Sequence, residues 1–353
     1  MKHFFKTQKI WIICFSVISV ITLLLMLIKT NYELQSPAVI TQVENFIIIE
    51  MPTDNNTDEI DDSDISTVSI YSFPRTSVFN YLIAKVNPFS DLYKLSENSN
   101  TSRNYILAQG NLHKNLSITK AIISGYKAAG YDVVTYYRGY IITTIANNCL
   151  SDLKIGDIIT SINGVELSDE KGIKDVLNQL KEEGATTFNA RILRDEKEQY
   201  VILKYDENGS FAFGGESSYT FPTIKNGPKF KVDKADSLGP SGGLMQTLYV
   251  YEQLTGCKLT SDIKVAGTGT VDAFGNAGLI GGIKQKIYIA NAFDVDVFFV
   301  PIDLSYENEE DQYRNWYQAQ EAVELLKKFG QNDMKVVPVK NIEEVISYLE
   351  GLQ

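Results

Sequence analysis

The stretch that decides the fold covers residues 236–293 and reads DSLGPSGGLMQTLYVYEQLTGCKLTSDIKVAGTGTVDAFGNAGLIGGIKQKIYIANAF. A glycine-rich turn at residues 239–243 precedes apolar residues at helical spacing, which stop at Gly256. The run IKVAGTGTV then reads as a buried strand, and GLIGGIKQKIYIANAF as a glycine turn that opens a second helix. The pattern predicts α/β packing, with a strand between two helices.

Two polar residues stand at the starts of these predicted helices. Small residues around Ser241 let a substrate backbone approach and leave N–H groups for an oxyanion, although a helix-capping serine is the common alternative. Lys284 falls in the first helical turn beside Ile283 and Ile287, where the helix dipole and apolar neighbours favour a lowered pKa. A lysine of lowered pKa can act as a general base, whereas a solvated lysine is the alternative.

Together these segments resemble the proteolytic domain of Lon-type serine proteases, which are Ser-Lys dyad peptidases. The resemblance covers roughly residues 229–352 and rests on GPSGGL and TGTVDAFGNAGLIGGIKQK. It implies that Ser241 is the nucleophile and Lys284 the base. Thr268, Gly239 and Gly242 are expected to support them.

A second resemblance lies in residues 135–205, on the pieces LKIGDIITSINGVEL and ARILRDEKEQYVILK. Short β-rich runs, the hairpin dipeptide Asn163-Gly164 and one helix resemble a PDZ domain of the bacterial protease-associated type. The resemblance implies a peptide-binding groove whose backbone N–H groups hold a carboxylate at Arg138, Gly139, Tyr140 and Ile141. A spacer without peptide binding is the alternative.

The amino terminus carries 19 residues without a charge, residues 10–28, which would span about 28 Å as a helix. Lysines precede this run, and only Lys29 follows closely, which favours a cytoplasmic amino terminus. We therefore expect a transmembrane helix in a single-pass protein of the cell membrane, with an extracellular catalytic domain. A cleavable signal peptide is the alternative, but no small-x-small cleavage site follows.

The expected fold class is α+β, in four segments. A basic tail and anchor occupy residues 1–30, strands and a helix residues 31–130, the PDZ-like domain residues 131–206, and the peptidase domain residues 207–353. Those last 147 residues are few for a Lon-type domain, so the strands at residues 43–73 should pack onto it. The acidic loop at residues 54–64 is expected to be solvated rather than a calcium site. Asn341 and Glu344 predict the start of a last helix.

Composition and motif content argue against several kinds of partner and site. A net charge of −11 argues against nucleic acid as a partner. His3 and His113 lack the spacing of a zinc site, so we expect neither a metal nor another cofactor, and no Ser-His-Asp triad. Cys149 and Cys257 could form a disulfide or remain thiols. No phosphate-binding loop occurs in the chain, so no nucleotide is expected.

The order of anchor, strands, PDZ-like insert and peptidase resembles the SepM/YlbL-like group of membrane-anchored bacterial proteases, some of which are named for pheromone processing. The resemblance implies a serine endopeptidase, with maturation of a secreted signalling peptide as one role. Because the chain has no phosphate-binding loop for an ATP-driven motor, we expect it to act without ATP and to cut only extended peptides or flexible segments. Two alternatives remain, a non-catalytic peptide-binding scaffold and a quality-control protease of surface proteins. The sequence leaves the oligomeric state open, including a homo-oligomer.

Overall fold

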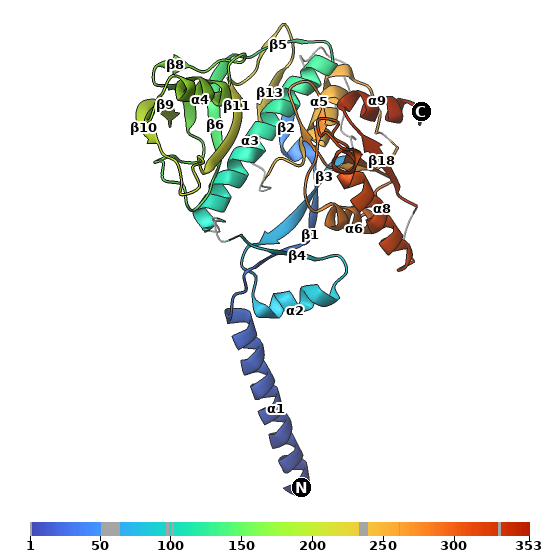
Figure 1. Ribbon diagram of the computed structural model, residues 1–353. Helices are drawn as coiled ribbons and strands as arrows, with labels where there is room; N and C mark the ends of the chain where they lie inside the picture. The colour runs from blue at the N-terminus through green and yellow to red at the C-terminus, as the bar shows by residue number, and fades with distance from the viewer. Residues whose placement is uncertain are drawn as a thin grey trace.

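The computed structural model describes residues 2–50, 64–96, 99, 102–232, 239–260, 262–330 and 333–353. These residues form an α+β structure with mixed sheets, which confirms the predicted class. Two sheets, each with its own hydrophobic core, lie on either side of a long helix (Figure 1). The predicted acidic loop lies outside the described residues except for Asp64.

A six-stranded sheet organises the larger part, called the main domain below. Its four parallel strands come from both halves of the chain, and two antiparallel strands complete one edge. In spatial order the strands are β18 (Lys335–Val339), β17 (Val297–Pro301), β14 (Val265–Gly267), β3 (Ile65–Phe73), β1 (Tyr32–Gln42) and β4 (Asp91–Lys94). The early strand β3 therefore lies beside β14, with Ile65 paired to Val265.

Helices cover both faces of this sheet, because successive side chains of a strand point to opposite faces. Phe299 points into a core with α3 (Arg103–Ala128), α5 (Gly243–Thr255) and α9 (Ile342–Glu350). Its neighbour Phe298 points into a second core, which α6 (Ile283–Ala292) and α8 (Arg314–Lys327) cover. The predicted cap of α9 is confirmed, since Asn341 Oδ1 accepts a hydrogen bond of 3.0 Å from Glu344 N.

The second sheet forms the β-rich domain, residues 137–219. Its strands in spatial order are β10 (Lys197–Leu203), β9 (Phe188–Arg194), β7 (Ile158–Ile162), β6 (Tyr137–Ile145) and β11 (Phe213–Tyr219), and β8 (Val165–Glu166) pairs with β7. Helix α4 (Ile173–Glu182) packs its apolar face on this sheet. The sheet extends beyond the expected boundary at residue 206, because β11 pairs with β6.

Short ribbons complete the fold. The chain enters and leaves the β-rich domain through β5 (Asp132–Val134) and β12 (Thr223–Lys225), which pair with each other. Beyond them, β2 (Ile47–Glu50), which follows η1 (Val43–Asn45), pairs with β13 (Lys229–Val232). A hairpin of β15 (Thr270–Val271) and β16 (Ala277–Gly278) follows β14, and α7 (Glu309–Gln312) precedes α8.

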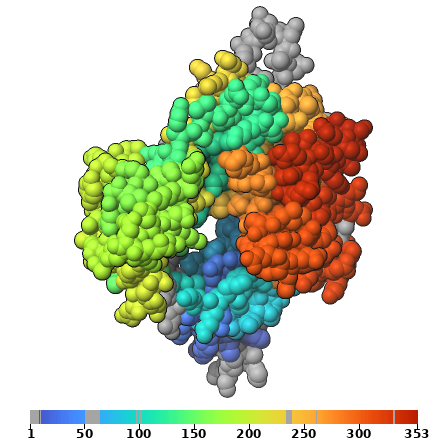
Figure 2. Space-filling view, turned by 45° about the horizontal axis from the view of Figure 1, so that its top comes forward, coloured from blue at the N-terminus to red at the C-terminus, as the bar shows by residue number. Residues whose placement is uncertain are grey.

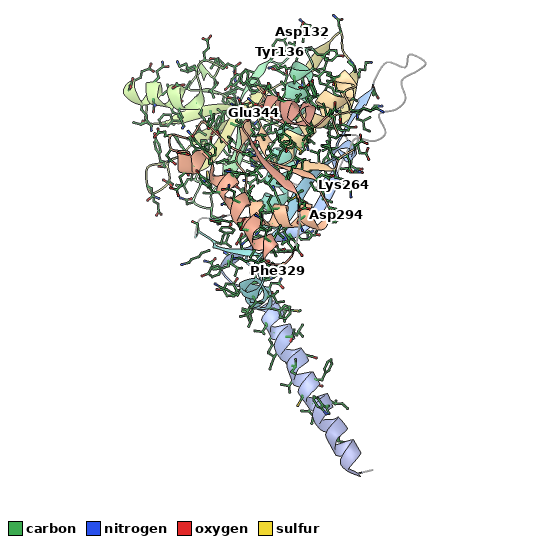
Figure 3. All side chains as sticks on the ribbon, turned by 90° about the vertical axis from the view of Figure 1, so that its right-hand side faces the viewer. Asp132, Tyr136, Lys264, Asp294, Phe329 and Glu344 are labelled. Carbon is green, nitrogen blue, oxygen red and sulfur yellow. The ribbon has the colours of Figure 1, made fainter. Side chains whose placement is uncertain are left out.

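Helix α1 (Lys2–Leu27) projects from the body next to α2 (Val78–Val86), and Figure 3 shows Asp132 and Tyr136 at the opposite end of the molecule. Among the residues that the structure describes, no helix combines the length and the apolarity needed to cross a membrane. The prediction of a transmembrane helix over residues 10–28 is therefore wrong, because a bilayer core requires about 20 apolar residues in one helix and no described helix meets that requirement.

Candidate functional site

The loop that carries Ser241 is held in place by helix α3. Gly239 adopts a φ of 92°, which favours glycine, and its N–H donates to Gly110 O at 3.0 Å. The hydroxyl of Ser117 donates to Pro240 O at 2.9 Å. Gly242, not Ser241, is the N-cap of α5, so the helix-capping interpretation of Ser241 does not describe this loop.

A buried lysine lies behind this loop. Lys286 of α6 is 2% exposed, and its Nζ donates to Thr268 Oγ1 at 2.8 Å. The same Thr268 hydroxyl donates to the carbonyl oxygen of Ser241 at 3.1 Å, which also accepts from Gly269 N at 2.9 Å. Burial lowers the pKa of Lys286 to about 7. Ser241, Thr268 and Lys286 are thus brought together at the end of β14.

Lys284 lies elsewhere. Its Nζ forms an ion pair with Asp91 of β4, and Asp91 also accepts from Gln285 Nε2 at 2.8 Å. Two helical residues that are two positions apart are rotated by about 200° about the helix axis, so their side chains point to nearly opposite sides of the helix. Because Lys286 faces Thr268, Lys284 must face away from it, so the predicted role of Lys284 as the base does not fit its position.

The sequence contained a signal for the buried lysine. Ile283, Lys286, Ile287 and Ala290 follow the spacing of one helical face, and all four are buried. Lys286 therefore lies between apolar residues of the same face, whereas Lys284 falls outside this spacing. Burying a charged lysine on an otherwise apolar face costs free energy, so a lysine at such a position is a candidate functional residue.

A cavity of about 820 Å³, called the interdomain cavity below, opens beside the Ser241 loop. Its lining comes from α3, from Gly215 and Glu216 of β11, from Pro240 and from the β15–β16 hairpin. Figure 2 shows the surface hollowed between the β-rich domain and the C-terminal half of the main domain. Lys120 of α3 bridges to Glu216 at 2.6 Å across this space. An extended peptide of a few residues fits a cavity of this volume.

The expected peptide-binding residues are not at a free edge. Gly139, Tyr140 and Ile141 lie within β6, which pairs with β11 on one side and β7 on the other. Arg138 is engaged by Glu196, whose carboxylate accepts two hydrogen bonds of 2.8 and 2.7 Å. A peptide cannot add a strand at these residues while β11 is in place, so the structure corrects this prediction.

Two further expectations concern cysteines and metals. Cys149 and Cys257 are both free thiols, so the disulfide alternative is wrong. Within the described part of the chain, no group of three or more His, Cys, Asp or Glu side chains is arranged to hold a metal ion. Neither a scan against protein-family models nor a search of curated proteins finds a match to this chain.

Proposed function

We propose that this protein is a serine endopeptidase that needs no ATP, with Ser241 as the nucleophile and Lys286 as the general base. The observation that carries the proposal is the burial of Lys286 next to Thr268 and the Ser241 loop. A pKa near 7 leaves a large share of this lysine neutral at neutral pH, and a neutral amine can accept a proton.

In the proposed reaction, the amine of Lys286 takes the hydroxyl proton of Ser241 as Oγ attacks a peptide carbonyl carbon. Backbone N–H groups of the loop stabilise the oxyanion that forms on the carbonyl oxygen. The carbon–nitrogen bond then breaks, and Lys286 returns its proton to the leaving amine, which gives an acyl-enzyme on Ser241. A water molecule, deprotonated by Lys286, attacks this ester and releases the second product.

Thr268 has a positioning role in this scheme. Its hydroxyl accepts from Lys286 and donates to Ser241 O, so it fixes the lysine amine relative to the nucleophile loop. The interdomain cavity supplies room for an extended chain next to Pro240. The absence of a phosphate-binding loop from the sequence supports cleavage of peptides or segments that are already extended.

The test uses the full chain and a mixed peptide library, with products identified by mass spectrometry. Four proteins are compared, the wild type, Ser241→Ala, Lys286→Met and the matched control Lys284→Met. We expect cleavage by the wild type and by Lys284→Met, and loss of at least about 1000-fold for the other two, because both belong to one dyad.

A single result decides between the two lysines. If Lys284→Met were inactive while Lys286→Met cleaved normally, the proposed dyad would be wrong. Cleavage by Ser241→Ala at the wild-type rate would reject the serine mechanism altogether. Added ATP should leave the rate unchanged, and strict dependence on ATP would contradict the proposal.

A further inference from the structure

Helix α3 contributes a buried hydroxyl to the Ser241 loop, although the two segments are distant in the sequence. Ser117 is 3% exposed, and its Oγ donates to Pro240 O at 2.9 Å. The same carbonyl oxygen also accepts from Gly243 N, at the longer distance of 3.3 Å. The hydroxyl of Ser117 is therefore its closer hydrogen-bond partner.

A second bond ties the same loop to the same helix. One residue earlier in the loop, Gly239 N donates to Gly110 O at 3.0 Å. Gly110 and Ser117 lie two helical turns apart, so both contacts arise from one face of α3. The Gly239 N–H and the carbonyl of Pro240, which lie on either side of the Gly239–Pro240 peptide group, are thus both attached to α3.

This attachment determines where the N–H of Ser241 points. The carbonyl of Pro240 and the N–H of Ser241 belong to one planar trans peptide group, so they point in opposite directions. Since Ser117 holds the carbonyl toward α3, the N–H of Ser241 is directed away from α3. Among the described residues, no backbone hydrogen bond is donated by this N–H.

We infer that Ser117 is a positioning residue that orients the N–H of Ser241 as a donor to the oxyanion. The inference rests on the proposed function. Without the hydroxyl, the peptide group is held by the longer bond to Gly243 alone and can rotate. Stabilisation of the transition state then falls, while binding of the ground-state substrate changes little.

The test compares Ser117→Ala with Ser124→Ala in the full chain. Ser124 lies two turns further along α3 and is equally buried, but its hydroxyl makes no hydrogen bond to the described residues. Loss of one oxyanion donor lowers kcat about 100-fold to 1000-fold in serine proteases, so a misoriented donor should cost about 10-fold to 100-fold. We expect this loss in kcat for Ser117→Ala, with KM within about twofold of the wild type.

The affinity for a transition-state analogue distinguishes a positioning role of Ser117 from a purely structural role, because loss of structural support alone would not change it in parallel with kcat/KM. The affinity of a peptide aldehyde should fall for Ser117→Ala in parallel with kcat/KM, while Ser124→Ala keeps both near wild type. Ser117→Thr retains a hydroxyl and should recover most of kcat. Thermal unfolding of the two alanine variants shows whether both remain folded at the assay temperature.

The outcomes separate this inference from the proposed function. If the wild type cleaves and Ser241→Ala does not, but Ser117→Ala retains the wild-type kcat, the role of Ser117 is refuted and the dyad remains. A loss confined to KM, or an equal loss in Ser124→Ala, would also refute it. If the wild type and Ser241→Ala behave alike, the proposed function itself fails.

Discussion

Replacing Lys286 by methionine tests how strongly the native protein disfavours charge at this position. Methionine has a similar length and no charge, so the substitution removes a titratable group from a site that is 2% exposed. Burial lowers the pKa of Lys286 from 10.5 to about 7. In the unfolded chain the lysine is solvated and has its ordinary pKa.

The sign and size of the effect follow from proton binding. Between pH 7 and pH 10.5 the unfolded chain holds this proton and the native protein does not, so the stability of the wild type rises with pH. One pKa unit corresponds to about 1.4 kcal/mol, so the full difference is about 5 kcal/mol. Between pH 7.5 and 9.5, the wild type should gain about 2 to 3 kcal/mol relative to Lys286→Met.

The assay is urea unfolding of both proteins, followed by tryptophan fluorescence at several pH values. Trp316 lies on α8 and packs against the core that α6 also contacts, so it reports on the domain that contains Lys286. Trp11 is 74% exposed and should contribute little change. A difference in side-chain packing adds a constant offset, whereas the slope with pH isolates the titration of Lys286.

A stability difference that stays constant from pH 7.5 to 9.5 would refute the reasoning. It would mean that Lys286 binds its proton equally well in the native and unfolded states. The burial that supports its role as a base would then have no energetic consequence. A slope of the opposite sign would show that the native site stabilises the charged lysine.

Two further substitutions test packing and charge. Gly125→Ala places a Cβ 2.5 Å from Val250 Cγ1, where α3 crosses α5. This overlap should destabilise the main domain by about 1 to 3 kcal/mol, although alanine has the better helix propensity. Unchanged or increased thermal stability would contradict this packing. The carboxylate of Asp157 is buried and forms an ion pair with Arg194 at 2.7 Å. Asp157→Ala removes this carboxylate and leaves the Arg194 charge unpaired, so it should destabilise the β-rich domain by about 3 to 5 kcal/mol in urea unfolding. A loss under about 1 kcal/mol would show that the pair contributes little.

The helical parts of the main domain could be predicted from the sequence because their apolar spacing is regular. The glycine-rich turn and the periodic residues after it correspond to α5, and Asn341 caps α9 as its sequence suggested. The small size of the C-terminal segment suggested that early strands join it, and the structure pairs β3 with β14. These inferences need only periodicity and the amount of chain available to form a core.

Other features depend on contacts that the sequence does not encode locally. Strand β11 reads FGGESSY, which lacks the apolar alternation of a strand, so its pairing with β6 could not be foreseen. Its position closes the edge at which a peptide was expected. Ser117 is one of many serines in the chain, and its contact with Pro240 spans 123 residues. The burial of Lys286, in contrast, follows from helical phase alone, because Lys286 shares the spacing of Ile283, Ile287 and Ala290 and Lys284 does not.

The pairing of β3 with β14 has a consequence for synthesis of the protein on the ribosome. Ile65 and Val265 are direct partners, yet they are 200 positions apart in the chain. At about 5 to 20 residues per second, β3 waits about 10 to 40 s for its neighbour. The strands of the β-rich domain are contiguous and can close their own core in that interval. One edge of β3 stays unpaired meanwhile, and an unpaired edge can pair with another chain, so we expect this segment of the nascent chain to need protection by chaperones.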